Sequence, residues 1–326
     1  MKRRLIDWSR GGGAAVALLL VCGFPAAAQT FDVYYLSVGS SDYAQASAAD
    51  AARGIRGFRN LRSANKSAVR VAGLLQDAGS PFGITITSDP SHPVRKSDVL
   101  RGLDSLMRTA RQAGSGRPLL FVYLAGHGVS EGLGWNHFTI PGDFTYRSPI
   151  SRTPILELGE RTVYAAEVVD TLEWSKIPFV LLLDNCTEGE QENFSVGVLT
   201  AEAARNANDV MATVRFMNEF HGANPVVFSS RPGTTVDAVR DPLDASSQVL
   251  VAPLSRRLMM MYDRALRAHQ SMTLRTFVND LVSPTFDPVA GAGVTVWDGS
   301  SLAGTLVPSN PLRRGRHVRF LGSTLR

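Results

Sequence analysis

The chain has 326 residues, of which 44% are hydrophobic and 19% are charged. This balance excludes an intrinsically disordered chain and a miniprotein held together by disulfides, and the length is sufficient to bury a sizeable core. The formal net charge of +5 at first favours a nucleic-acid partner, so the distribution of the charges has to be considered.

The first 28 residues have the pattern of a secretory signal peptide. Four basic residues lie within residues 1–10, residues 11–28 carry no charge, and the apolar centre is residues 14–21. Residues 26–28 are alanines, the small residues that signal peptidase requires, so we predict cleavage before Gln29 and export to the periplasm or outside the cell. The apolar stretch is shorter than the roughly 20 residues of a spanning helix, which disfavours an uncleaved anchor and any stable membrane span after leader removal.

The charges that remain after the leader argue against a nucleic-acid partner. The chain then keeps 30 basic and 28 acidic residues, and five of the basic ones are arginines within residues 313–326. Residues 29–312 are therefore slightly acidic, whereas a nucleic-acid-binding protein carries a basic face on its folded body. We interpret the arginine-rich end as a solvated tail or a surface contact.

Strands and helices alternate along the rest of the chain. Short apolar runs predict strands at residues 31–38, 82–87, 118–125, 179–183 and 226–228. Helical spacing of apolar residues predicts helices at 61–77, 167–172, 201–220, 254–266 and 274–282, and a further helix that Ser97 caps between the second and third strands.

The order of these elements and their hydrophobicity predict the fold class. Residues 118–125 and 179–183 are apolar throughout, which is typical of strands covered on both faces. We therefore predict an α/β fold, a three-layer sandwich with a mostly parallel sheet covered by helices on both faces. Residues 283–326 are rich in proline and glycine, with one strand-like piece at 293–297, and are predicted to be a C-terminal extension with a basic tail.

Two of the predicted strands end in residues that can carry chemistry. Residues 118–125 run into Gly126-His127-Gly128, and residues 179–183 run into Asp184-Asn185-Cys186. Ligands of open α/β sheets bind outside the carboxyl ends of the strands, so His127 and Cys186 are predicted to be neighbours in space. Cys186 is the only cysteine after the leader. An unpaired thiol in an oxidising compartment is either buried as a small hydrophobe or kept for its reactivity.

A cysteine and a histidine at adjacent strand ends are suited to nucleophilic catalysis. A free thiol has a pKa of about 8.5 and is only a few per cent thiolate at neutral pH. A neighbouring imidazole can generate the thiolate and then protonate the leaving amine. The N–H groups of Gly128 and Cys186 are candidates for an oxyanion hole. Taken singly, His127 and Cys186 are more often structural, but the pair at two strand ends favours catalysis.

These motifs resemble those of the caspase-like cysteine peptidases. Residues 123–128 (YLAGHG) resemble the histidine motif, and residues 181–189 (LLLDNCTEG) resemble the aspartate-x-cysteine-x-x-glycine motif of the metacaspase branch. The resemblance covers about residues 31–282 and implies an exported, bacterial-type member of the caspase/metacaspase superfamily with its peptidase domain at 29–282. It implies a thiol endopeptidase that cleaves a peptide or protein substrate without a cofactor, with Cys186 as the nucleophile and His127 as the general base and acid.

The resemblance also bears on substrate binding. In metacaspases two acids help to form the pocket for an arginine or lysine, and Asp184 matches one of them while Ser67 stands in place of the other. Asp184 indicates cleavage after basic residues, although it could equally cap the turn that presents Cys186. The missing acid at Ser67 keeps open a second interpretation, a catalytically inactive caspase-fold protein that binds peptide in the same cleft.

A serine hydrolase that uses Ser130 is a further alternative. Residues 128–132 match Gly-x-Ser-x-Gly, a motif that needs a serine on a tight turn between a strand and a helix. The predicted strand stops about five residues earlier and no helix start follows, so the match is interpreted as a coincidence. No metal-ligand spacing and no phosphate-binding loop are present in the sequence, and the oligomeric state is left open.

Overall fold

The computed structural model describes most of the chain between residues 29 and 322. The described residues are 29–55, 57–114, 116–131, 136–146, 161–185, 224–229, 238–243, 249–268, 272–283, 295–297, 304–308 and 318–322. The predicted leader, Cys186 and the predicted helix at 201–220 lie outside them. Within the described part of the chain, no helix combines the length and hydropathy needed to cross a membrane.

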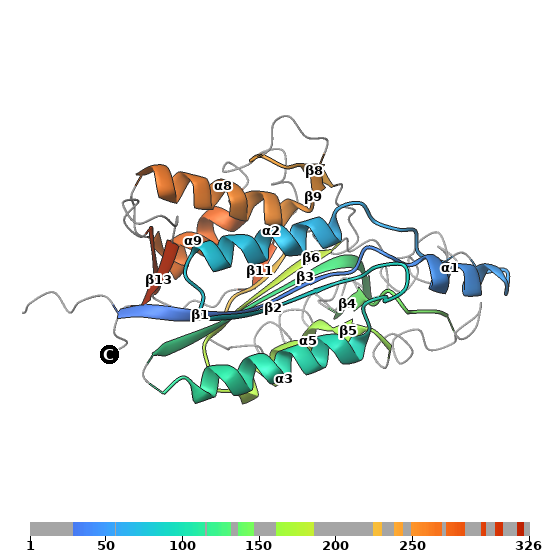
Figure 1. Ribbon diagram of the computed structural model, residues 1–326, viewed down its shortest axis with the longest axis horizontal. Coiled ribbons are helices and arrows are strands. Elements are labelled where there is room, and N and C mark those ends of the chain that lie inside the picture. The colour runs from blue at the N-terminus through green and yellow to red at the C-terminus, as the bar shows by residue number, and fades with distance from the viewer. Residues whose placement is uncertain are drawn as a thin grey trace, which may run out of the picture.

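Five parallel strands form the centre of the sheet (Figure 1). Their spatial order is β2-β1-β3-β6-β7, and every contact along this order is parallel. Their bounds are Gln29–Gly39 for β1, Phe82–Thr87 for β2, Arg117–Glu131 for β3, Phe179–Asn185 for β6 and Val226–Phe228 for β7. The mostly parallel sheet that the sequence predicts is thereby confirmed.

Helices cover both faces of this sheet (Figure 1). One face carries α2, α8 and α9, and the other carries α3 and α5. These helices span Ala64–Asp77 (α2), Lys96–Gln112 (α3), Ala165–Trp174 (α5), Pro253–Ala268 (α8) and Leu274–Val282 (α9). Along β3, Phe121 and Tyr123 pack under α2 and α8, whereas Val122 and Leu124 pack against the opposite helices. Because both faces of β3 are buried, its sequence does not alternate, and the α/β fold is the predicted three-layer sandwich.

Strands from residues 283–326 join the same sheet. The bounds of the late strands are Met272–Thr273 (β10), Thr295–Trp297 (β11), Gly304–Pro308 (β12) and Val318–Gly322 (β13). β11 lies antiparallel to β7, β13 lies antiparallel to the start of β1, and β12 bridges β13 and β10. The sequence indicated only the first of the three strands beyond residue 283. Arg319, one of the arginines of the basic end, has its main chain in β13.

Two local details differ from the sequence expectations. The helix expected to start after Ser97 begins at Lys96, and the carboxylate of Asp98 accepts the N–H of Arg95, its N-cap residue, at 2.9 Å. Ser97 therefore lies inside the first turn of the helix and does not cap it. The capping side chain is that of Asp98, one residue later, which reaches back to the free N–H of Arg95. Helix α1 (Ala44–Ala51) was not expected, since its residues are small and show little helical amphipathicity.

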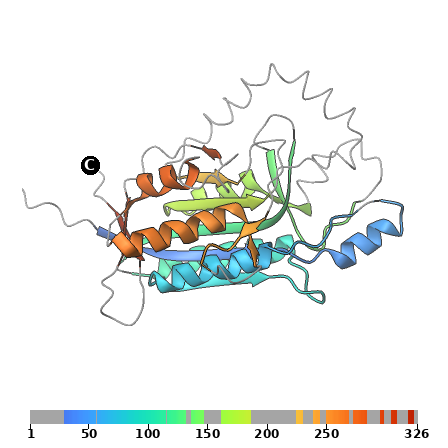
Figure 2. The same cartoon turned by 90° about the horizontal axis from the view of Figure 1, so that it is seen from above.

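Strand β3 continues past the point where the sequence predicts its end. It forms an antiparallel hairpin with β4 (Asn136–Ile140), which pairs in turn with β5 (Val163–Tyr164). His127 thus lies within a strand rather than in a turn, because β4 supplies main-chain partners beyond Ala125. Figure 2 shows this hairpin bending away from the other parallel strands. A short two-stranded sheet, β8 (Val239–Arg240) with β9 (Leu250–Val251), lies apart from the main sheet.

Candidate functional site

The two predicted catalytic positions follow a pair of residues that are partners in the sheet. Gly126 of β3 pairs with Asn185 of β6 in parallel register. His127 directly follows Gly126, and Cys186 directly follows Asn185. Neighbouring strands lie about 4.8 Å apart, so the two residues that immediately precede the predicted catalytic positions are neighbours in the sheet. Cys186 lies outside the described residues, and its approach to the imidazole stays a prediction.

The imidazole of His127 is hydrogen-bonded in a way that fixes its tautomer. Its Nε2 atom lies 2.8 Å from the main-chain carbonyl oxygen of Arg59. A carbonyl oxygen can only accept, so Nε2 carries the proton, and the neutral ring keeps a lone pair on Nδ1. Burial lowers the pKa of His127, and the bond to the Arg59 carbonyl opposes that effect. The ring is therefore set up as a neutral base at Nδ1.

Aromatic side chains from the segment after β1 hold the same ring in place. Tyr43 meets the imidazole edge-on at a centroid distance of 4.9 Å, and Phe58 lies at 5.0 Å. Tyr43 belongs to a small buried core, the aromatic cluster, whose other members are Ile55, Val129, Ile140, Phe144 and Tyr146, and Phe58 packs against it. The aromatic cluster fixes residues 40–55 and 57–63 against the β3–β4 hairpin. The sequence did not predict that Tyr43 and Phe58 contact the His127 ring. The one indication was that these aromatic residues occur in a segment that has no strand pattern.

Asn185 connects the end of β6 to three neighbouring strands. Its Nδ2 donates to the carbonyl of His127 at 3.5 Å, and Thr139 of β4 donates to its Oδ1 at 3.5 Å. Its own carbonyl accepts a shorter bond, 2.8 Å, from the hydroxyl of Ser229 just after β7. The two side-chain contacts are long and individually weak. Together the three contacts hold the residue that precedes Cys186.

A second histidine lies beside Asn185 and was not identified from the sequence. His137 of β4 is 2% exposed, its Nε2 lies 3.4 Å from Oδ1 of Asn185, and its ring packs edge-on against Phe228. Burial lowers the pKa of His137 to about 4. Its Nδ1 has no hydrogen-bond partner among the described residues. His137 is therefore a neutral, buried side chain that packs behind Asn185.

Asp184, predicted as a substrate-binding residue, is a buried helix cap. Its side chain accepts hydrogen bonds from the Tyr123 hydroxyl at 2.7 Å and from the N–H groups of Leu254 and Ser255 at 3.1 and 2.9 Å. The last two are in the first turn of α8, where a carboxylate is favoured by the free N–H groups and the helix dipole. Burial raises the pKa of Asp184 to about 6, and the donated bonds oppose that rise. Both oxygens are engaged within the protein, and 3% of the residue is exposed.

Ser67, the second predicted substrate-binding residue, is also fully buried. Its hydroxyl accepts the N–H of Ala252 at 2.8 Å. Ser67 and Asp184 thus both bind the segment at the start of α8. In the structure both residues therefore stabilise the start of α8, which is a different role from the expected one.

The remaining predicted residues lie in the β3–β4 hairpin. Gly128 is opposite Thr139, and Ser130 is opposite His137. Ser130 therefore lies in an antiparallel hairpin, not in the strand–turn–helix elbow that a Gly-x-Ser-x-Gly serine needs. Among the described residues, no group of three or more His, Cys, Asp or Glu side chains is placed to hold a metal ion.

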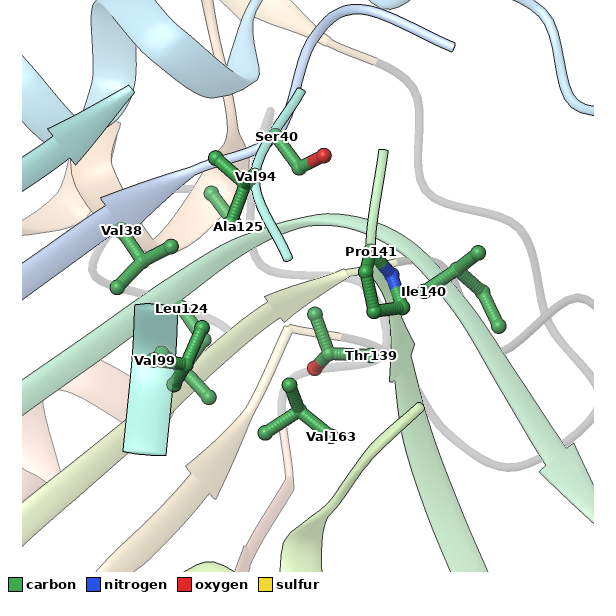
Figure 3. Close-up of a pocket in the computed structure, with 10 residues that line it drawn as sticks. All are labelled: Val38, Ser40, Val94, Val99, Leu124, Ala125, Thr139, Ile140, Pro141 and Val163. Carbon is green, nitrogen blue, oxygen red and sulfur yellow. The ribbon is translucent and has the colours of Figure 1, made fainter. Parts of the chain in front are cut away.

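A small cavity lies beside the carboxyl end of β1 and the middle of β3, on the face covered by α3 and α5 (Figure 3). Its lining is mostly aliphatic: Val38, Ser40, Val94, Val99, Leu124, Ala125, Thr139, Ile140, Pro141 and Val163. Its volume of about 10 Å³ is room for roughly one water molecule. Substrate pockets are on the order of 300–1,000 Å³, so this cavity is a packing gap behind the site.

Comparisons with known proteins assign no family to the chain. No family model matches it, and no curated protein matches it. Among solved structures the chain is similar to Raptor from Chaetomium thermophilum, at 12% identity and a TM-score of 0.30, over 73% of this chain and 18% of that one. The chain thus spans less than a fifth of the Raptor chain, and a likeness at this level supports neither a fold family nor a function.

Proposed function

We propose that the chain is an exported, caspase-like cysteine endopeptidase, in which Cys186 is the nucleophile and His127 is the general base and acid. The observation that carries the proposal is the hydrogen bond from Nε2 of His127 to the Arg59 carbonyl, which leaves Nδ1 as the basic nitrogen. The β3–β6 register supports it, because the residues before His127 and Cys186 are sheet partners.

The alternation of side chains along the strands adds a second argument. Tyr123 and Asp184 are hydrogen-bonded on the face that α2 and α8 cover. His127 lies four residues after Tyr123, and Cys186 lies two residues after Asp184. Since the period of a strand is two residues, alternation that continued to position 186 would direct the thiol to the same face as the imidazole.

The proposed reaction uses these two groups in sequence. Nδ1 of His127 takes the proton from the thiol, and the sulfur of Cys186 then forms a bond to the carbonyl carbon of the scissile peptide. The N–H groups of Gly128 and Cys186 are proposed as donors to the oxyanion. The imidazolium gives its proton to the leaving amine as the C–N bond breaks, and water then hydrolyses the thioester.

The proposal does not extend to a preference for basic residues before the cut. The carboxylate of Asp184 and the hydroxyl of Ser67 are buried and bonded to the start of α8. The same observation favours a second candidate function, peptide binding without hydrolysis, because the two residues expected to bind a basic side chain are instead hydrogen-bonded to the start of α8.

The decisive experiment combines a thiol-directed activity probe with peptide-library cleavage by protein that begins at Gln29. We expect labelling of Cys186 and cleavage of peptides, and a loss of at least about 100-fold in cleavage for Cys186→Ala and for His127→Ala. His92→Ala is the matched control, since this histidine is exposed and its ring bonds to Asp89, three residues earlier in the same turn.

Each alternative gives a different result. Folded protein that binds peptides but neither cleaves them nor reacts at Cys186 is the peptide-binding protein. Labelling by a fluorophosphonate that Ser130→Ala abolishes indicates the serine hydrolase. Full activity in Cys186→Ala contradicts the proposal.

A further inference from the structure

The hydroxyl of Tyr43 lies between two sheet partners at the candidate site. It accepts the N–H of His127 at 3.1 Å and donates to the carbonyl of Ile140 at 3.0 Å. His127 and Ile140 are opposite each other in the β3–β4 hairpin. Tyr43 is 1% exposed, so this bridge is shielded from water. A side chain from the segment after β1 therefore links the two strands of the hairpin at the histidine itself.

Tyr43 also contacts the imidazole and the segment that fixes its tautomer. Its ring meets the ring of His127 edge-on at 4.9 Å and packs on Phe58 at 6.0 Å. Its main-chain N–H donates to Oδ1 of Asn60 at 2.7 Å, and Asn60 directly follows Arg59, whose carbonyl binds Nε2 of His127. One residue thus contacts the main chain of His127, its ring and the neighbour of its hydrogen-bond acceptor.

We infer that Tyr43 is a positioning residue for His127, an inference that rests on the proposed function. It holds the imidazole with Nε2 on the Arg59 carbonyl, so that Nδ1 is the unprotonated nitrogen that acts as the base. Removal of the hydroxyl leaves a buried N–H on His127 and a buried carbonyl on Ile140 without this partner, so the hairpin has to shift. A displacement of about 1 Å is enough to lower a catalytic rate by up to about 100-fold.

The test compares Tyr43→Phe with Tyr35→Phe in protein that begins at Gln29. Tyr35 is a matched control because it is also 1% exposed and its hydroxyl also accepts a hydrogen bond, from Gln76 at 2.7 Å, in the core under α2. We expect Tyr43→Phe to lower kcat by about 10- to 100-fold with KM within about threefold of wild type. The ¹⁵N shifts of the His127 ring should move from the Nε2–H tautomer towards a mixture. Tyr35→Phe should change neither kcat nor the ¹⁵N shifts of the His127 ring.

The outcomes separate this inference from the proposed function. Wild-type kcat together with an unchanged His127 tautomer in Tyr43→Phe overturns the inference. If wild-type protein cleaves no peptide, the proposed function fails, while the ¹⁵N shifts still decide whether Tyr43 fixes the ring. If Tyr43→Phe does not fold, 3-fluorotyrosine at position 43 keeps the ring and alters the acidity of the hydroxyl. A change in the His127 shifts then supports the inference, and unchanged shifts overturn it.

Discussion

The carbonyl oxygen of Arg59 and Nε2 of His127 are 2.8 Å apart, although the two residues are separated by 68 positions in the chain. The contact joins the segment after β1 to the far part of β3. Because the acceptor is a main-chain atom, the identity of residue 59 does not determine it. The tautomer of the candidate base is therefore set by the fold of residues 57–63, which the aromatic cluster holds in place.

The pH dependence of cleavage should follow from the environment of His127. Burial lowers the pKa of this imidazole from its usual 6.5, so the neutral form persists below that pH. We expect the acid limb of kcat/KM to fall below pH 6.5, measured on a peptide substrate across pH 4–9. An acid limb centred well above pH 6.5 would contradict the assignment of His127 as the base.

Asp184 should contribute to stability through the start of α8. Asp184→Ala leaves the Tyr123 hydroxyl and two N–H groups of α8 without this acceptor, and we expect a loss of about 2–5 kcal/mol in the free energy of unfolding at pH 7. Asp104→Ala is the control, since its carboxylate is exposed and pairs with Arg108 on α3. That change should stay within about 0.5 kcal/mol in urea titrations. Equal losses for both variants would rule out the cap.

His137 should make the protein less stable in acid. Its pKa is lowered from 6.5 to about 4, so between these values the unfolded chain binds the proton and the folded chain does not. Stability contributed by the neutral ring is fully present above pH 6.5 and is lost as pH falls to 4, by about 3 kcal/mol. His137→Gln, which does not titrate, should lack this loss when urea unfolding is compared at pH 4, 5, 6 and 7.

Asp184 changes the free energy of unfolding with pH in the opposite direction to His137. The comparison of wild type with His137→Gln has to separate the two effects. Its pKa is raised to about 6, so the folded protein holds that proton more tightly than the unfolded chain. Stability from the protonated carboxyl is present below pH 3.8 and is lost as pH rises through 6. The difference between wild type and His137→Gln isolates the histidine, because both proteins contain Asp184. A difference that does not change with pH would contradict the buried, neutral state of His137.

Substrate selection should not depend on Asp184. Its oxygens bind the start of α8, and Ser67 binds Ala252 of the same segment. We expect peptide-library profiling to show cleavage that is not confined to sites after arginine or lysine. A strict requirement for a basic residue would contradict this expectation and would mean that α8 moves when substrate binds.

Much of the scaffold could be predicted from the residues alone. Strands β2 and β7 and helix α9 have the bounds that the sequence indicated. These elements are encoded locally, since a short apolar run or a helical spacing of apolar residues is sufficient to specify each one. The long strand β3 was predicted only as far as Ala125, because glycines on both sides of His127 suggest a turn. Pairing with β4 keeps those residues extended, and that pairing is not a local property.

The candidate site divides in the same way. The sequence alone determined that His127 and Cys186 each follow a fully apolar run, because each run and the residues after it are contiguous in the chain. Only the tertiary structure decided that Arg59 and Tyr43 orient the imidazole, that His137 lies behind Asn185, and that Asp184 caps α8. Those contacts join residues that are 48 to 84 positions apart. Short-range periodicity carries no information about which distant groups meet, and burial and hydrogen bonding settle that choice only when the whole chain folds.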